Sequence, residues 1–259
     1  MELYQVDAFA DQLFKGNPAA VMVLEKFLPA DVMQNIAMEN NLAETAFVVP
    51  RDEPGQYDLR WFTPGMEIDF CGHATIASAH ILATELGHQP PFHFHVIIGE
   101  LIVGVKDDLY QMDAPITALK AADVTPDMGA AFGQSINEAY WAHKNLLLIL
   151  ESEADVRAAE PDLPLIKTLS EDGVIITARG TDFDCVSRYF APNALVDEDP
   201  VTGSAHAAIG PYWAAKLGQS KLTAYQASQR GGILWIDVGT DRMTISGKAV
   251  TYLRGEITL

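Results

Sequence analysis

The chain has 259 residues, of which 49% are hydrophobic and 20% are charged, a profile typical of a globular protein with one large domain or two ordinary ones. Its 17 Lys and Arg and 35 Asp and Glu residues give a net charge of −18, which argues against binding to nucleic acid or to an anionic membrane surface. It has only two cysteines, no signal-peptide pattern and no apolar run near the roughly 18 residues that a membrane span needs, so a cytoplasmic location is expected.

The first part of the chain contains alternating apolar runs and helical stripes. Strands are predicted at 3–9, 19–24, 42–49, 57–62, 92–98, 101–105 and 110–115, and helices at 29–40 and 74–86. The strands at 92–98 and 101–105 are interpreted as a hairpin that turns at Gly99-Glu100.

Segment 116–127 is the predicted boundary between two halves, 1–115 and 116–259, and a return of the C-terminal strand to the first half is left open. In the second half, helices are predicted at 128–138, 153–159, 164–170 and 205–217, and strands at 145–150, 173–178, 184–190, 232–238, 242–247, 250–253 and 257–259. The helices at 74–86 and 205–217 are apolar nearly all round, which favours burial. Each half is therefore predicted to be an α+β unit with a sheet curled around a central helix.

One motif occurs twice. Arg60-Trp61-Phe62-Thr63-Pro64 precedes Cys71-Gly72-His73-Ala74, and Arg188-Tyr189-Phe190-Ala191-Pro192 precedes Thr202-Gly203-Ser204-Ala205. A glycine turn that opens into a helix leaves backbone N–H groups at the positive end of the helix dipole, where a carboxylate or phosphate can bind. Two similar half-molecules facing each other would aim two such helix starts into one cleft.

The first half holds two candidates for proton transfer. Glu44 lies in an apolar strand, and burial would raise the pKa of its carboxyl group, as a general base or acid requires, although it could also face solvent. His73 follows the turn glycine, where the helix dipole favours a neutral imidazole that carries protons near neutral pH. The alternative for His73 is a capping role.

The matching positions of the second half are Asp199 and Ser204. Asp199 could orient a substrate or relay a proton, and Ser204 could donate a hydrogen bond to a carboxylate, whereas ordinary N-capping would explain both. Cys71 is either a thiol acid or base or a plain buried residue. Its counterpart is Thr202, so a two-thiol mechanism is not available.

Metal and cofactor sites are not predicted. His93 and His95 share one face of a strand, but no third ligand is evident. No phosphate-loop or dinucleotide-binding glycine pattern occurs in the chain.

Together the motifs resemble the PhzF-like isomerase family of phenazine biosynthesis. The segments that carry the resemblance are Phe14 to Val21 with Gly16-Asn17-Pro18, Asn41 to Phe47, Phe62-Thr63-Pro64, Cys71 to Thr75, Phe190-Ala191-Pro192, Glu198 to His206, and Gln229 to Gly232. They cover nearly the whole chain, and they are specific as a set in this order.

The resemblance implies the diaminopimelate-epimerase fold, with two pseudo-symmetric halves, each a barrel-like sheet around a central helix, and an active site in the cleft between them. It also implies cofactor-independent proton transfer on a small anionic carboxylic acid, and a homodimer. By position, the implied catalytic residues are Glu44, His73 and Asp199, and the implied substrate-binding residues are Gly72, Gly203 and Ser204.

The chain departs from the two-cysteine racemases and epimerases of this fold because Thr202 stands opposite Cys71. One carboxylate would then both remove and return the proton. Two alternatives stay open: a one-thiol epimerase or racemase that uses Cys71, and a binding protein that retains the fold without catalysis.

Overall fold

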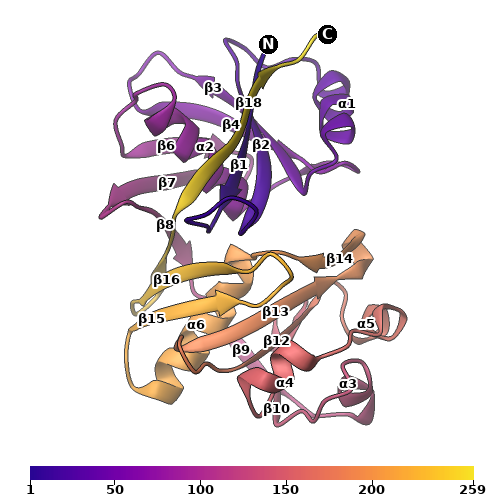
Figure 1. The fold of residues 1–259 in the computed structure, drawn as a ribbon. Helices are drawn as coiled ribbons and strands as arrows, with labels where there is room; N and C mark the ends of the chain where they lie inside the picture. Colours follow the sequence, from indigo (N-terminus) through magenta and orange to yellow (C-terminus); the bar gives the residue numbers. More distant parts are fainter. The chain divides into compact units, whose positions relative to one another are not determined.

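The computed structural model describes residues 1–259. These residues form two compact units, the first made of 1–113 and 246–259 and the second of 114–245 (Figure 1). The C-terminal strand β18 (Ala249–Glu256) returns to the first unit, where it pairs antiparallel with β1 (Glu2–Ala8). Figure 1 shows this yellow strand beside the indigo one.

The first unit is a sheet around one central helix. Besides β1 and β18 it contains β2 (Asn17–Val23), α1 (Ala30–Asn40), β3 (Glu44–Pro50), β4 (Gln56–Phe62), β5 (Glu67–Ile68), α2 (Gly72–Thr84), β6 (Phe92–Val96), β7 (Gly99–Lys106) and β8 (Leu109–Pro115). The strands pair in the order β18-β1-β2-β3-β4-β6-β7-β8, and only β2–β3 and β4–β6 of these neighbours are parallel.

Helix α2 is the core of this unit. Every residue from Gly72 to Leu82 is buried, and the helix packs against β1, β2, β3 and β7. A helix that is apolar on all faces gains by removing all of them from water, at about 25 cal/mol for each Å² of apolar surface. The predicted central helix is therefore confirmed.

The second unit repeats this design. It contains β9 (Leu119–Ala122), α3 (Pro126–Ala130), β10 (Glu138–Ala142), β11 (Asn145–Ile149), α4 (Glu153–Ala158), α5 (Leu163–Leu169), β12 (Val174–Arg179), β13 (Cys185–Ala191), β14 (Val196–Asp199), α6 (Gly203–Leu217), β15 (Lys221–Gln226), β16 (Gly232–Val238) and β17 (Arg242–Gly247). The strands pair in the order β9-β10-β11-β12-β13-β15-β16, with β11–β12 and β13–β15 parallel. The predicted α+β class with two similar halves is confirmed.

The repeated Arg-aromatic-Phe-x-Pro segment has a structural purpose. Arg60 of β4 makes a bidentate ion pair with Glu67 of β5, with N···O distances of 2.6 and 2.7 Å. Arg188 of β13 makes the same pair with Glu198 of β14, at 2.7 and 3.0 Å. Each pair fixes the strand that leads toward the glycine turn of its unit.

Some predicted elements were wrong. The helix predicted at 128–138 ends at Ala130, because the chain turns at Gly133 with φ of +62° and then enters β10. The β6–β7 hairpin turns at Ile97-Ile98 and not at Gly99-Glu100, and the segment 257–259 is not a strand. Strands β9, β10, β14 and β15 were not predicted. None of the helices is long and apolar enough to cross a membrane.

Candidate active site

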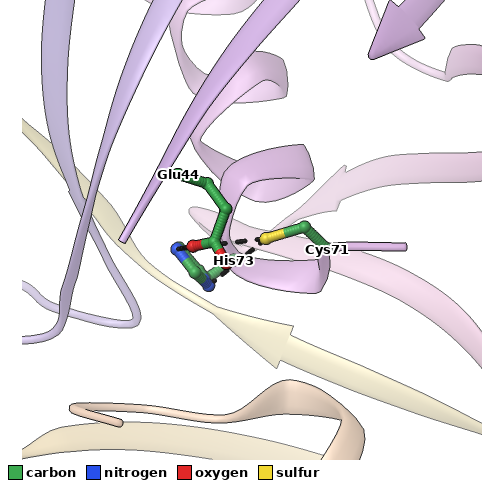
Figure 2. A group of neighbouring side chains, drawn as sticks. All are labelled: Glu44, Cys71 and His73. Carbon is green, nitrogen blue, oxygen red and sulfur yellow. Dashed lines mark hydrogen bonds and ion pairs between the residues drawn. The ribbon is translucent and has the colours of Figure 1, made fainter. Parts of the chain in front are cut away.

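Glu44 is the first residue of β3, where its backbone is in register with Ala19 of β2. Its side chain is only 15% exposed, and its Oε2 atom lies 2.9 Å from Nε2 of His73 (Figure 2). No hydrogen-bond donor is aligned with Oε2, so this contact is an ion pair and not a well-directed hydrogen bond. A largely buried carboxylate with an unused acceptor direction is suited to receiving a proton.

His73 lies in the first turn of α2 between Glu44 and Cys71. Its Nδ1 atom is 3.5 Å from Sγ of Cys71, and its Nε2 atom faces Glu44 (Figure 2). Burial opposes a positive charge on the ring, but the contacts with Cys71 and with the Glu44 carboxylate outweigh it and raise the pKa of His73 well above its usual range. The expectation of a neutral imidazole is thus opposed, because a carboxylate in contact outweighs the helix dipole.

Cys71 is the N-cap residue of α2 and has extended backbone angles. Burial and the nearby charge of Glu44 raise the pKa of its thiol, with His73 acting in the opposite direction. Since a free thiol titrates near pH 8.5, the raised pKa keeps Cys71 protonated at neutral pH. The thiol is therefore a poor nucleophile in this state.

Asn17 is a fourth side chain in the cluster of Glu44, His73 and Cys71. It was not predicted from the sequence as a site residue. Its side chain is fully buried, and its Nδ2 atom lies 3.3 Å from Nδ1 of His73. The turn before it depends on Gly16, which has φ of +65° and where a Cβ atom would come within 2.1 Å of the Ala8 carbonyl oxygen. The Gly16-Asn17-Pro18 motif indicated a turn but not the contact with His73.

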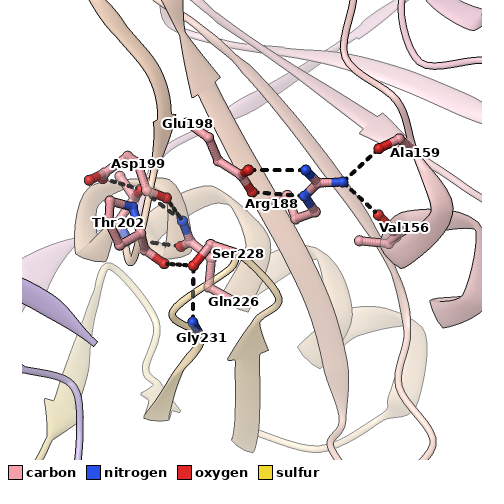
Figure 3. Close-up of polar contacts among 10 residues, drawn as sticks. Val156, Ala159, Arg188, Glu198, Asp199, Thr202, Gln226, Ser228 and Gly231 are labelled. Carbon is pink, nitrogen blue, oxygen red and sulfur yellow. Dashed lines mark hydrogen bonds and ion pairs between the residues drawn. The ribbon is translucent and has the colours of Figure 1, made fainter. Parts of the chain in front are cut away.

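The second unit has its own polar cluster, drawn in Figure 3. The side chain of Gln226 donates to the Asp199 carbonyl oxygen at 2.7 Å and to Thr202 Oγ1 at 3.1 Å, and it accepts from the Thr202 N–H at 2.8 Å. Thr202 Oγ1 in turn donates to the Asp199 carboxylate. Gln226, which sequence reasoning missed, thereby fixes the loop that contains Asp199.

Both central helices begin without a side-chain cap. Neither Cys71 at α2 nor Thr202 at α6 accepts a hydrogen bond from the first-turn N–H groups. In α6 the hydroxyl group of Thr202 is engaged with Asp199 and Gln226 instead. The first-turn amides of both helices are thus free of a side-chain cap, and anion binding there stays a prediction.

The structure brings together Glu44, His73 and Cys71 in the first unit, and Asp199 with Thr202 in the second. Ser204 follows the buried Gly203 and is exposed on the first turn of α6. That the two helix starts face each other across one cleft stays a prediction. The homodimer also stays a prediction.

The two strand histidines have other partners. His93 contacts the carboxylate of Glu100 at 2.9 Å, and His95 contacts the amide oxygen of Gln56 at 2.5 Å. Cross-strand pairing accounts for both side chains on this face of β6.

Comparison with known proteins places this architecture in a family. The family model described as "Phenazine biosynthesis-like protein" (PhzC-PhzF) matches residues 6–255. An uncharacterized isomerase of Pseudomonas aeruginosa is 46% identical, over 100% of this chain and 99% of the relative. The crystal structure of a PhzF family protein from Enterococcus faecalis superposes with a TM-score of 0.96 at 46% identity, covering 100% of this chain and 99% of that one.

The fold extends to more distant enzymes. A probable proline racemase of Agrobacterium radiobacter has a TM-score of 0.68 at 11% identity, covering 100% of this chain and 93% of that one, and shares the fold alone. The epimerase-like fold predicted from the sequence is confirmed. With the family model spanning nearly the whole chain and the relatives named isomerases, this protein belongs to the phenazine biosynthesis-like (PhzC-PhzF) family and is an isomerase.

Proposed function

We propose that the protein moves a proton between two carbon atoms of a small cyclic or open-chain carboxylic acid, with Glu44 as the base that removes the proton and the acid that returns it. The observation that carries this proposal is the largely buried Glu44, whose Oε2 atom faces Nε2 of His73 at 2.9 Å without an aligned hydrogen bond. Side chains that carry protons suffice for such a step, so it requires no cofactor.

His73 assists Glu44 in this proposal. A protonated imidazole 2.9 Å from the carboxylate stabilises the ionised form of Glu44 before it takes a proton from carbon. The imidazole also provides an N–H donor for negative charge that develops on the substrate. Cys71, whose thiol pKa is raised by burial, stays protonated and takes no part in the transfer.

The second unit contributes substrate binding in this proposal. The uncapped first turn of α6 at Gly203, with the exposed hydroxyl group of Ser204, provides donors for the acid group. Gly72 at the start of α2 is the matching donor in the first unit, and a Cβ atom there would lie 3.2 Å from the Met112 side chain. Asp199, held by Gln226 and Thr202, orients a polar group of the substrate.

The strand registers favour a single base. In the first unit Glu44 pairs with Ala19 at the start of the parallel β2–β3 ladder. In the second unit Val174 pairs with Phe190 of the repeated motif, as Thr45 pairs with Phe62 in the first, so Gly173 occupies the position of Glu44. A glycine has no side chain that could carry a proton, so removal and return of the proton fall to Glu44 on one face of the substrate.

The experiment is Glu44→Gln in deuterium oxide, with NMR detection of solvent deuterium in a panel of cyclic and amino acids. Once the panel yields a substrate for the wild type, the variant should lose exchange by about 10³-fold or more while binding changes only a few-fold. Glu25→Gln, an exposed carboxylate at the end of the β2–β3 ladder opposite to Glu44, is the matched control and should exchange as the wild type does. Undiminished exchange in Glu44→Gln would overturn the assignment of the base.

A one-thiol epimerase is the second candidate. The observation in its favour is the Cys71 Sγ to His73 Nδ1 distance of 3.5 Å, within reach of proton transfer through a small adjustment. Against it stands the raised pKa of the thiol. Cys71→Ala distinguishes the two candidates. A Glu44 mechanism should remain active without the thiol, whereas a one-thiol mechanism should not.

A further inference from the structure

Three side chains of different chemistry meet at the start of α2. Oε2 of Glu44, a ring nitrogen of His73 and Sγ of Cys71 all lie within 4.8 Å of one another. They come from the start of β3, the first turn of α2 and the residue before it. Cys71 and His73 are buried, and Glu44 retains an acceptor direction that no donor fills.

The spacing of these atoms suits a small tetrahedral metal ion. A Zn²⁺ ion bonded to sulfur, nitrogen and oxygen at its usual distances separates its ligand atoms by about 3.3–3.6 Å. In this structure Nε2 of His73 is 2.9 Å from Oε2 of Glu44 and 4.0 Å from Sγ of Cys71. These two separations lie on either side of the tetrahedral value, and the third, between Oε2 of Glu44 and Sγ of Cys71, is at most 4.8 Å, so side-chain shifts of about 1 Å complete a three-ligand site.

We propose that Glu44, His73 and Cys71 form an inhibitory binding site for Zn²⁺ and similar thiophilic divalent cations. The ion bonds to the Cys71 thiolate, to a neutral ring nitrogen of His73 and to a Glu44 oxygen, with water as the fourth ligand. Binding releases the thiol proton and any proton on His73 to solvent. The site as such stands on the geometry, whereas inhibition rests on the proposed function, because the ion would occupy the Glu44 oxygen.

The donor set also determines which ions bind. A thiolate and an imidazole favour Zn²⁺ and Co²⁺ over Mg²⁺ and Ca²⁺, which prefer oxygen ligands. Because metal binding displaces protons from its ligands, affinity should rise with pH.

The test is titration of the full chain with Co²⁺ at pH 8, followed by absorption spectroscopy. A near-ultraviolet band from thiolate-to-cobalt charge transfer and visible bands of tetrahedral Co²⁺ should appear together, and equimolar Zn²⁺ should remove both. The Cys71→Ser variant should lose the near-ultraviolet band. Cys185→Ser is the matched control, because Cys185 is the other buried thiol of the chain and lies in β13 of the second unit.

A second variant keeps the test decisive if Cys71→Ser does not fold. Glu44→Gln should keep the charge-transfer band but bind Co²⁺ at least tenfold more weakly. Absence of the band in the wild type at a large excess of Co²⁺, or a band that Cys71→Ser leaves unchanged, would refute the site. This readout needs no turnover, so failure of the proposed isomerisation leaves it intact, and a wild-type isomerase that Zn²⁺ does not inhibit would refute only the inhibitory role.

Discussion

The two units of this protein share a framework but not a set of reactive groups. Both have a parallel two-strand ladder, a bidentate Arg–Glu ion pair and a glycine turn that opens into a buried helix. At the turn itself the first unit has Cys71 and His73 close to Glu44, whereas the second has Thr202, which is bonded to Asp199, and the exposed Ser204. Packing residues thus preserve the repeat, while the helix starts have diverged.

Because of this divergence, the two units have different roles in the proposed reaction. The first unit contains Glu44 and His73, the proposed proton-transfer pair, and the second contains hydroxyl and amide groups together with the Asp199 carboxylate, which bind the substrate in this proposal. Substitutions at matched positions should therefore change different kinetic constants.

The largest effect is expected from His73→Asn compared with Ser204→Ala. Loss of the imidazole beside Glu44 should lower kcat by about 10²–10³-fold, as expected for a group that assists proton transfer. Ser204→Ala should instead raise KM by roughly tenfold with little change in kcat, because one hydrogen bond to the acid group is lost. Steady-state kinetics on the identified substrate separates the two, and similar effects on kcat would refute the division.

The buried histidines of the two central helices should respond alike to acid. Burial lowers the pKa of His80 in α2 and of His206 in α6 to about 4. In the unfolded chain both titrate near 6.5. Their contribution to the free energy of unfolding is therefore complete above pH 6.5. It is lost as the pH falls toward 4, at about 3 kcal/mol for each histidine.

Urea unfolding at a series of pH values between 7 and 4 measures this loss. His206→Gln removes one titrating group and should reduce the pH dependence by about 3 kcal/mol relative to the wild type at pH 4. His73 contributes oppositely, since its raised pKa stabilises the fold below pH 6.5 and that stability is lost as the pH rises. An unchanged acid slope in His206→Gln would contradict the assignment.

The repeated Arg–Glu pairs should differ in their contribution to stability. The Arg188 side chain is 12% exposed and also donates to the carbonyl oxygen of Ala159 at 2.7 Å, whereas the Arg60 side chain is 27% exposed. Arg188→Met should therefore cost about 3 kcal/mol, because it leaves a half-buried Glu198 without its partner. Arg60→Met should cost only about 1–2 kcal/mol, since water screens that pair.

Chemical denaturation at pH 7 tests this order. Glu198→Gln in the Arg188→Met background should recover part of the loss, because it removes the unpaired charge. Equal losses in the two arginine variants would mean that the local burial does not set the strength of the pairs.

Much of the fold was visible in the sequence because packing leaves periodic signals. The all-apolar helices and the repeated lead-in predicted two units with central helices, and the structure has both. Strand β15 was missed, since Lys221 to Gln226 is a short run of mixed polarity after Gly218. The helix predicted at 128–138 was wrong because intrinsic helix propensity yielded to the left-handed turn at Gly133.

The candidate site was less visible because its contacts are not periodic. Glu44 and His73 were selected as candidates, but nothing in their spacing indicates that 2.9 Å separates them. Asn17 and Gln226 act through contacts with residues 56 and 24 positions away. Such pairings depend on the tertiary fold, so the sequence alone could not assign them.

The smallest effect is expected from Cys71→Ala, which makes the first helix start as free of a thiol as the second. A Glu44 mechanism needs only the backbone at this position, so kcat should fall less than tenfold, or about 1.4 kcal/mol in the activation barrier. Because the thiol is protonated at neutral pH, its removal takes no charge from beside His73, and the pH profile of kcat/KM should keep its position. Kinetics from pH 5 to 9 measures both, and a loss as large as that of Glu44→Gln would instead establish the one-thiol mechanism.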